Sequence, residues 1–509
     1  MKHRFSHSRR WVRWLAAEPF FWIIVVVFVL QAAWLALSGR YPMAFDENFH
    51  LGIIQLYAHH LSPFWSSQPR NADAYGAVAR DPSYLYQYLM SFPYRLISVF
   101  THDQTIQVLI LRGLNIALLA TSLPVFRRLL QKSGASRALT HVCLAVYVLI
   151  PVVPLLGAQI NYDNMLIPLA ALALLLTLHL NEKLVKHKPL DIRLFLSLAT
   201  LCLLTSLVKY SFLPIFLAVV LFLLVRFWQV YGRPSEVWQS TRQGLQRMSR
   251  RSLWLFSLLA LISAGLFVQR YGVNVARYHN PVPTCDQVLS VQQCSAYAPW
   301  ERDYQFKVIR EATKQAKPSA KTYVSDWFYG MWFRTFFSVD GLYTNFETRE
   351  PLFVPGVAGI IFAGTGAVAV LLTARRLFRD YHVQTLVLFL LAAALYTAAL
   401  FLDEYQSYVA TAQPVAINGR YLLPVLPLIL VLLALGYGEL LKRWLSARLL
   451  LASVAIVSLL WGGGALTYIL RSNKDWYWPN QQVYDVNHAV QDVIGPRTPG
   501  YDSPTQFSL

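Results

Sequence analysis

The chain has 509 residues, of which 56% are hydrophobic, 14% aromatic and only 14% charged. Globular domains carry about a quarter of their residues as charged side chains, so this composition excludes an ordinary soluble protein. The formal net charge of +19 invites a nucleic-acid interface, but lysine and arginine gather in short clusters between apolar segments rather than along one groove. We therefore expect no nucleic-acid partner.

Apolar stretches of about 16 to 24 residues recur along the sequence, each long enough to cross most or all of a roughly 30 Å hydrocarbon layer. Helices satisfy their own backbone hydrogen bonds in lipid. The sequence therefore predicts an all-α polytopic membrane protein with about eleven transmembrane helices. In chain order they are expected at 20–38, 106–126, 138–157, 163–180, 192–208, 211–227, 253–269, 353–373, 383–402, 421–438 and 449–470.

Basic clusters orient these spans. They lie at 2–13, 127–137, 183–193, 226–251, 375–379 and 442–448, and the positive-inside rule places such clusters in the cytoplasm. The first apolar run is longer than the core of a signal peptide and no small-residue cleavage site follows it, which favours a retained helix. This topology predicts a multi-pass protein of the cell (plasma) membrane, with a cytoplasmic N-terminus and an extracytoplasmic C-terminus.

Two long polar segments then lie outside, at 39–104 and 271–352, within a membrane domain at 1–470 that precedes an external tail at 471–509. We expect juxtamembrane helices in the first of them. Long ordered loops are where function tends to concentrate. Cys285 and Cys294 lie close together in the second segment, and they can pair as a disulfide if it faces an oxidising compartment.

The motif Phe-Asp-Glu-Asn-Phe-His at 45–50 directly follows the first predicted helix. Two adjacent carboxylates at a membrane surface repel each other and lose solvation, so they need a cation, a hydrogen-bond donor or a chemical role. If Asp46 caps a helix that runs through His60, Asp46 and His50 share one face, while Glu47 points about 100° away. An ordinary helix cap with an acidic first turn explains the pair equally well.

Three further polar clusters lie at predicted outer helix ends. The run Asp-Pro-Ser-Tyr-Leu-Tyr at 81–86 can be a binding segment or an aromatic interfacial belt. Lys209 can present its ammonium group to a lipid phosphate or simply extend to the headgroups. In Asn418-Gly419-Arg420-Tyr421, glycine permits close backbone approach and arginine offers a bidentate fork for phosphate, although an ordinary helix-end arginine fits too.

A divalent metal is a further alternative. His50, His59 and His60 lie near Asp46 and Glu47 in the sequence, and these residue types can supply ligands for an ion such as Mg or Mn. Single histidines at a membrane interface are usually not ligands. The metal requirement therefore stays open, with Asp46, Glu47 and His50 as the ligands if there is one.

In this order, the motifs resemble those of the GT-C superfamily of membrane glycosyltransferases, which includes protein O-mannosyltransferases and aminoarabinose transferases acting on lipid A. The hallmark of that group is an acidic motif in the first external loop, matched here by Asp46-Glu47. The run at 81–86 is similar to its Pro-Pro-Leu-Tyr-Tyr segment, with a departure at Ser83. An uncharacterised bacterial branch adds Asp-Glu-x-x-His, a lysine that ends a mid-chain helix, here Lys209, and Gln-Gly-Arg-Tyr-x-x-Pro, here with Asn418 in first place.

The resemblance implies a GT-C-like fold and transfer of a sugar from a polyprenyl-phosphate donor to a glycan, lipid or protein acceptor on the extracytoplasmic face, with inversion. It implies that Asp46 is the catalytic base and that Glu47 orients the acceptor or holds a metal. Lys209, Arg420 and Tyr421 are expected at the donor lipid phosphate. Contacts with the acceptor or sugar are expected from His50, Tyr84, Tyr86, Asp163 and Trp327.

Two other classes of protein fit the same composition. A transporter or flippase of lipid-linked sugars usually has inverted repeats and broken helices with charges at the midplane, whereas the ionisable residues here gather at the outer rim. A non-catalytic subunit for envelope assembly is the third class. If the chain is a transferase, Asp46, Lys209 and Arg420 should converge within roughly 10–15 Å, the span of a sugar phosphate and its acceptor.

Overall fold

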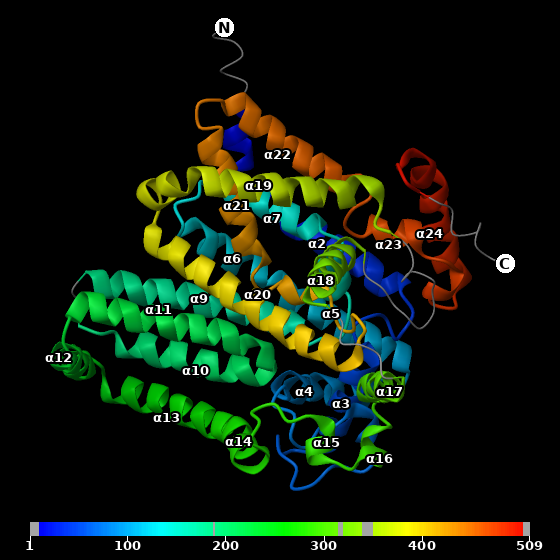
Figure 1. The fold of residues 1–509 in the computed structure, drawn as a ribbon, viewed down its shortest axis with the longest axis horizontal. Coiled ribbons are helices and arrows are strands. Elements are labelled where there is room, and N and C mark those ends of the chain that lie inside the picture. Colours follow the sequence, from blue (N-terminus) through cyan, green and yellow to red (C-terminus); the bar gives the residue numbers. More distant parts are fainter. Residues whose placement is uncertain (1–9, 187–188, 314–318, 338–349, 502–509) are drawn as a thin grey trace.

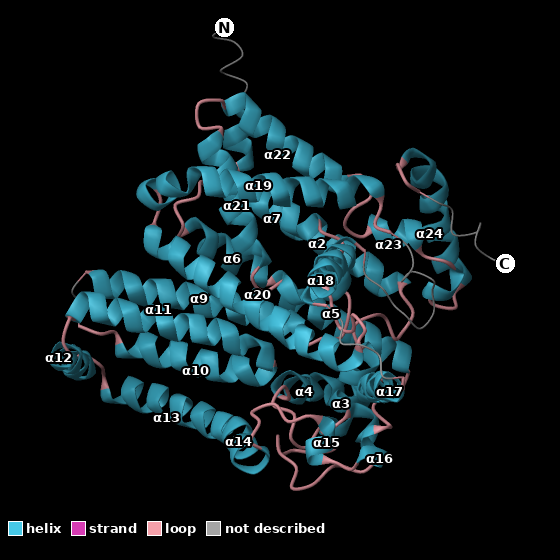
Figure 2. Ribbon diagram, in the orientation of Figure 1, coloured by secondary structure: helices cyan, strands magenta, loops and turns pink. Residues whose placement is uncertain are grey.

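The computed structural model describes residues 10–186, 189–313, 319–337 and 350–501. These residues form helices joined by loops, with one isolated β-bridge between Gly39 and Tyr477 and no named strand (Figure 2). Seven helical stretches are long and apolar enough to cross a membrane. They contain α2 (Glu18–Ser38), α5 (Gln104–Ala120) with α6 (Ser122–Gln131), α9 (Asp163–Val185), α11 (Leu213–Tyr231), α13 (Arg250–Phe267) with α14 (Val273–Tyr278), α19 (Phe353–Asp380) and α20 (Val383–Thr411).

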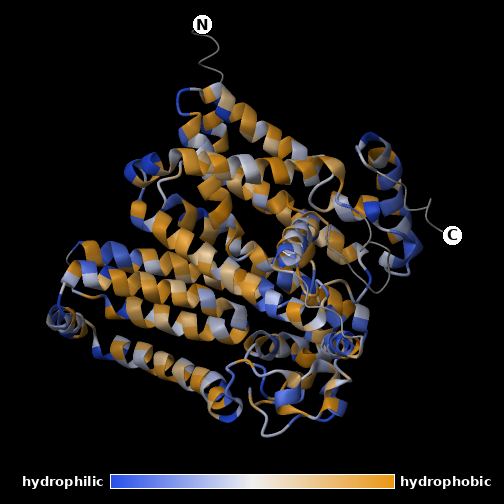
Figure 3. Ribbon diagram, viewed as in Figure 1, coloured by the Kyte–Doolittle hydropathy of each residue, from blue (hydrophilic) through white to orange (hydrophobic). Residues whose placement is uncertain are grey.

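Four shorter apolar helices accompany them: α7 (Arg137–Leu149), α10 (Ile192–Val208), α21 (Leu426–Leu440) and α22 (Leu445–Leu460). Each predicted span falls on one of these eleven stretches, and the prediction of an all-helical polytopic membrane protein is confirmed. Hydrophobic residues predominate in the long helices, and hydrophilic residues are more frequent at helix ends and in the connecting segments (Figure 3). This is the distribution expected of helices with lipid-facing sides.

The helices form two packed groups joined by α20 (Figure 1). In the first group α9, α10, α11 and α13 lie side by side, with α10 against both α9 and α13. In the second group α21 packs between α7 and α19, while α22 contacts both of these. Helix α20 contacts α11 on one side and α21 on the other. Helix α6 likewise contacts α9 as well as α7 and α21, so both helices join the two groups.

Two of the predicted continuous spans are interrupted at breaks that meet. The span at 138–157 divides at Pro151 into α7 and α8 (Val152–Gly157), because proline cannot donate a helical hydrogen bond. The span at 449–470 divides into α22 and α23 (Leu466–Arg471) at a glycine turn, where Gly464 has a φ of 57° and donates to Leu149 O at 2.7 Å. The side chain of Gln31 in α2 binds a free backbone group at each break: it donates to Val148 O at 3.3 Å and accepts from Ala465 N at 3.0 Å.

The first long polar segment contains two helices, α3 (Glu47–Ala58) and α4 (Leu85–Phe100), which pack on each other. Helix α3 ends at Ala58, two residues before His60, and Arg95 Nη2 donates to Tyr57 O at 2.5 Å and to His60 O at 2.9 Å at this helix end. The second segment contains α15 (Cys285–Val288), α16 (Val291–Cys294), α17 (Ala298–Ala312) and α18 (Ala320–Phe336). A disulfide joins Cys285 to Cys294.

The C-terminal tail is helical and docks on the first membrane helix. Its helix α24 (Gln481–Ile494) follows α23 and contacts α2. Asn487 accepts from Trp34 Nε1 at 2.9 Å and donates to Ser38 Oγ at 3.1 Å. The tail therefore packs next to the end of α2 from which the acidic motif emerges.

Candidate active site

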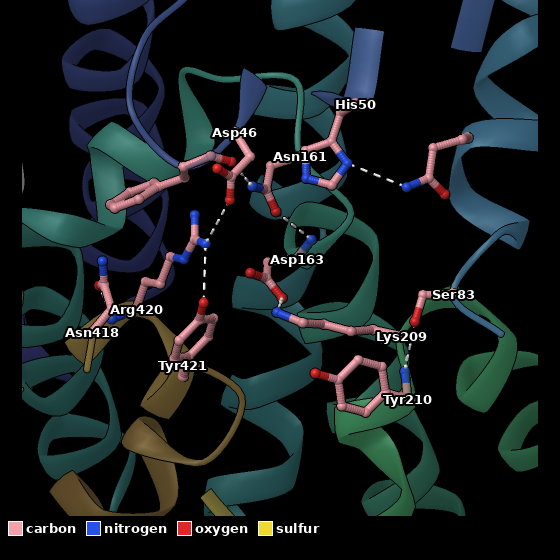
Figure 4. Close-up of polar contacts among 12 residues, drawn as sticks. Asp46, His50, Ser83, Asn161, Asp163, Lys209, Tyr210, Asn418, Arg420 and Tyr421 are labelled. Carbon is pink, nitrogen blue, oxygen red and sulfur yellow. Dashed lines mark hydrogen bonds and ion pairs between the residues drawn. The ribbon is translucent and has the colours of Figure 1, made fainter. Parts of the chain in front are cut away.

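Asp46 stands at the turn between α2 and α3, and its side chain does not cap the helix. Phe45 and Asp46 both adopt the left-handed backbone conformation, with φ of 63° and 62°, which costs non-glycine residues energy and is concentrated at functional sites. The Asp46 carboxylate makes no capping hydrogen bond. It lies 3.4 Å from Nη2 of Arg420 and is 58% exposed (Figure 4). The ordinary helix-cap interpretation therefore does not account for this side chain.

Glu47 points the other way and is fully buried against Arg112 of α5. Arg112 Nε donates to Oε1 at 2.8 Å and Nη2 donates to Oε2 at 2.7 Å. The same two oxygens also accept from Ile160 N at 3.2 Å and Met43 N at 2.8 Å. With four donors around a buried carboxylate, Glu47 is arranged to hold the chain segments around Asp46 together.

The segment that carries Arg420 folds as its sequence suggests. The side chain of Asn418 accepts from Arg420 N at 3.0 Å and so starts a short helical turn, η5 (Gly419–Leu422). Gly419 packs directly against α18: a Cβ atom there would lie 1.8 Å from Thr335 Oγ1 and 2.7 Å from Met331 O. Only glycine permits this approach, and it brings Arg420 into the interior next to Asp46.

The guanidinium of Arg420 is buried and only partly satisfied. Its Cζ lies 4.3 Å from the ring centroid of Phe45 and 5.0 Å from that of Tyr421. Nη2 donates to the Tyr421 hydroxyl at 3.2 Å as well as to Asp46. The Nε and Nη1 atoms are buried and have no hydrogen-bond partner. An unpaired buried cationic donor is costly, so this group is suited to receive an anion.

Lys209 follows the last residue of α10 and lies beside the ring of Tyr421, which Arg420 also contacts. Its Nζ lies 4.3 Å from the ring centroid of Tyr162 and 4.8 Å from that of Tyr421, and it donates to Asp163 Oδ1 at 2.7 Å. The other oxygen, Asp163 Oδ2, is buried without a partner. Burial lowers the pKa of the Lys209 ammonium group to about 8, against the opposing effect of Asp163. Lys209 and Arg420 thus flank Tyr421, and the structure brings both together with Asp46.

Three asparagines form a polar layer beneath these groups. Asn161 donates to Phe45 O at 3.0 Å and accepts from Asp163 N at 2.9 Å, which links the Asp46 turn to the start of α9. Asn115 accepts from Asn164 Nδ2 at 3.1 Å and from the Tyr86 hydroxyl at 2.7 Å. The sequence analysis did not assign Asn115, although a buried asparagine inside an apolar helix was a visible signal.

His50 lies behind this layer, one helical turn after Asp46. The centroid of its ring is 4.4 Å from that of Tyr162. His50 Nδ1 lies 3.2 Å from the side-chain amide of Gln87, and it donates to the amide oxygen when that oxygen faces the ring. Burial lowers the pKa of His50 well below its usual value, and the charges of Arg420 and Lys209 add to this effect. His50 is therefore a neutral imidazole at pH 7 with Nε2 as acceptor.

Asp46, Glu47 and His50 do not combine into a metal site. Glu47 is engaged by Arg112 and His50 by Gln87, while Asp46 faces Arg420. Across the described parts of the chain, no group of three or more histidine, cysteine, aspartate or glutamate side chains is placed to hold an ion. These three residues therefore do not form a three-ligand metal site.

The remaining predicted contact residues are more scattered. Tyr86 supports the asparagine layer through Asn115. The Tyr84 ring lies 4.5 Å from the buried guanidinium of Arg270, and its hydroxyl is buried without a partner. Trp327 of α18 packs against α20, where its indole nitrogen donates to Glu404 at 2.5 Å. Its described contacts are thus with α20 rather than with Asp46.

No protein-family model matches this chain, and no curated protein sequence matches it either. Among solved structures, the oligosaccharyltransferase of Archaeoglobus fulgidus, crystallised in complex with zinc and sulfate, is similar to it with a TM-score of 0.43 and 14% identity. The match covers 91% of this chain and 56% of that one, so the chain spans little more than half the length of that protein. These values are too low to assign the chain to a family.

Proposed function

We propose that this protein is a membrane glycosyltransferase that transfers a sugar from a polyprenyl-phosphate donor to an acceptor hydroxyl on the extracytoplasmic face. The observation that carries the proposal is the pairing of Asp46 with Arg420. An exposed carboxylate and a buried guanidinium with two unpaired nitrogen donors lie 3.4 Å apart at one end of the helical bundle. Sugar transfer from a lipid phosphate needs these two functions side by side, a base and an anion site.

Asp46 is the proposed general base. As the acceptor oxygen attacks the anomeric carbon, its proton passes to the Asp46 carboxylate, and the bond between the anomeric carbon and the phosphate oxygen breaks. The electron pair of that bond leaves with the polyprenyl phosphate. Because the attack is a single displacement, the configuration at the anomeric carbon inverts. The open side of Asp46 supports this role, since a base must reach the hydroxyl it deprotonates.

Arg420 is the proposed ligand of the donor phosphate. Its free Nε and Nη1 atoms can donate charge-assisted hydrogen bonds to phosphate oxygens. The Tyr421 hydroxyl accepts from Arg420, so its own proton remains available to a phosphate or sugar oxygen. Lys209 adds a second positive charge across the Tyr421 ring while Asp163 holds it in place. Stabilisation of the leaving phosphate by such fixed charges is the largest contribution expected in this chemistry.

Glu47 has a different proposed role from Asp46. Its carboxylate is enclosed by Arg112 and two backbone amides, so it acts as a positioning residue for the Phe45-Asp46 turn. His50, as a neutral imidazole near Tyr162, is proposed to contact the sugar or acceptor. Tyr84 and Tyr86 are proposed to shape the walls of the site rather than to touch the reacting atoms, whereas Trp327, which contacts α20, is not assigned to it.

An apolar cavity near the arginine segment supports a lipid-linked donor. It has a volume of about 270 Å³, begins at Thr335 and Phe336 of α18, and follows α21 from Leu426 to Gly438. Thr335 lies directly against Gly419, next to Arg420. The cavity can hold part of a polyprenyl chain, with the hydrocarbon removed from water, and it lies beside the segment that carries Arg420.

The test is transfer by the purified protein in proteoliposomes supplied with radiolabelled polyprenyl-phosphate sugars and a panel of acceptors. Wild-type protein should release polyprenyl phosphate and label an acceptor, and Asp46→Asn should bind the donor without transferring its sugar. Movement of the donor across the bilayer without any transfer would instead identify a transporter. If the folded protein neither moves nor transfers any of the donors, that result would favour a non-catalytic assembly subunit.

A further inference from the structure

Helix α12 (Pro234–Gln246) lies at the end of the bundle opposite to the candidate site. It connects α11 to α13, and Figure 1 shows it end-on, across the ends of these two helices. Lys209 precedes α11, which has 19 residues and is therefore about 28 Å long. The features of α12 are thus independent of the proposed glycosyl transfer.

One face of α12 is fixed to the protein. Ser240 and Gly244, one helical turn apart, are buried against the loop before α10. Ser240 Oγ accepts from Leu190 N at 3.0 Å and bonds the Tyr231 hydroxyl at 2.7 Å. A Cβ atom on Gly244 would lie 2.1 Å from Leu190 O, so glycine permits this close approach. The helix is therefore a docked part of the structure.

The opposite face carries large apolar side chains. Trp238 and Leu245 are seven residues apart, which places them on one side of the helix and away from Ser240. Trp238 is 71% exposed, and two tryptophans of the flanking helices, Trp228 in the last turn of α11 and Trp254 in the first turns of α13, are 72% and 76% exposed. Tryptophans gather in this way at membrane–water interfaces.

Five arginines whose side chains have no partner lie on α12 and at its two ends. All five are exposed, and within the described residues none of their side chains makes a hydrogen bond or an ion pair. The only acidic residue among positions 233–251 is Glu236. The arginines are Arg233, Arg242, Arg247, Arg250 and Arg251.

We propose that α12 lies in the membrane interface and binds the headgroups of anionic phospholipids through these five arginines, with Trp238 and Leu245 inserted among the acyl chains. Charge complementarity selects this partner over a zwitterionic lipid. Each arginine within a Debye length of an anionic surface is attracted to it. The exposed tryptophans select a membrane over a soluble acidic protein, since an interfacial helix buries its apolar face in the headgroup region.

The test places a nitroxide on Leu245→Cys in the full chain. Both free cysteines, Cys143 and Cys202, are buried, so labelling is specific. Collision of the nitroxide with oxygen and with a water-soluble nickel complex measures its depth in vesicles of phosphatidylcholine, with or without phosphatidylglycerol. We expect a lipid-exposed label that moves deeper when phosphatidylglycerol is present, and we expect high salt to abolish this shift in the wild-type background.

A variant with all five arginines replaced by glutamine should lose the phosphatidylglycerol-dependent shift. The matched control is Arg375→Gln with Arg376→Gln, two exposed arginines after the apolar part of α19, which should keep it. A label that stays in water in both vesicles would overturn the proposal and favour a protein partner or a solvated helix. A depth that does not respond to phosphatidylglycerol, or a response that survives in the five-glutamine variant, would also overturn it.

Discussion

Glu47 and Arg112 form a bidentate ion pair in which neither side chain has any exposed surface. Arg112 also donates to Ala36 O at 2.8 Å and to Gly39 O at 2.6 Å at the end of α2. The pair thereby fixes α5, the end of α2 and the start of α3 to one another. The strained backbone at Phe45 and Asp46 follows directly from this anchoring, because α3 cannot relax away from it.

Replacing Glu47 by glutamine should therefore affect stability first. The substitution keeps the shape but leaves the buried Arg112 charge uncompensated, which costs about 3–5 kcal/mol. Thermal unfolding in detergent, followed by circular dichroism, should show a large decrease in Tm. The control is Asp286→Asn, which changes an exposed carboxylate without an ion pair to a buried cation and should leave Tm nearly unchanged. Equal Tm values for the two variants would contradict the assignment of Glu47 as the anchor.

Replacing Asp46 by asparagine should abolish the proposed proton transfer while preserving the shape of the site. Loss of a general base lowers the rate by about 10²–10⁴-fold. Single-turnover transfer of a radiolabelled sugar should decrease by this factor, with donor binding within a few-fold of wild type. Asp286→Asn, an exposed carboxylate near the disulfide, is the control and should react normally. If the Asp46 variant transfers at the wild-type rate, the base lies elsewhere.

Arg420→Lys tests the anion site. Lysine keeps the charge but cannot reproduce the fork of donors of the guanidinium. Two of these donors, Nε and Nη1, have no partner in the structure. A charged hydrogen bond contributes about 1.5–3 kcal/mol, so the Kd of the polyprenyl-phosphate donor should increase about 10- to 100-fold. Arg302→Lys, at an exposed position, provides the comparison. An unchanged Kd in Arg420→Lys would remove Arg420 from the donor site.

Topology alone was sufficient to predict where the polar groups meet. Lys209 and Arg420 each stand between apolar segments at the same predicted side of the membrane, and Asp46 follows the first helix on that side. Assigning the basic clusters to the cytoplasm therefore places Asp46, Lys209 and Arg420 at the same end of the helical bundle. The structure adds the reason they touch: Gly419 lets its segment approach α18, and Tyr421 provides a ring for both cations.

The sequence could not predict which side chains pair with each other. Nothing in the motif at 45–50 distinguishes the exposed Asp46 from the buried Glu47, because the difference depends on Arg112, 65 residues away from Glu47. The break between α22 and α23 had a visible signal, three consecutive glycines at 462–464. Hydropathy conceals that break, since glycine does not interrupt an apolar window. Its cause is the contact with α7 at Leu149, which no local pattern reports.

The last prediction concerns the pH dependence of donor binding. Burial lowers the pKa of Lys209 to about 8, so the ammonium group is charged below that pH and neutral above it. The donor phosphodiester stays anionic throughout. Donor affinity should therefore be constant below about pH 7 and weaken as the pH rises through about 8. Neighbouring groups do not mask this change: burial keeps His50 neutral, and burial raises the pKa of Tyr162 and of Tyr421.

Lys209→Arg isolates the lysine in this profile. Arginine remains protonated at every accessible pH, so the alkaline decrease in donor affinity should disappear in the variant, whatever its affinity at neutral pH. The Kd of the donor, measured from about pH 6 to 10 for both proteins, decides the matter. An alkaline decrease that persists in Lys209→Arg would assign the titration to another group. A flat wild-type profile would mean that Asp163, 2.7 Å away, keeps Lys209 charged despite its burial.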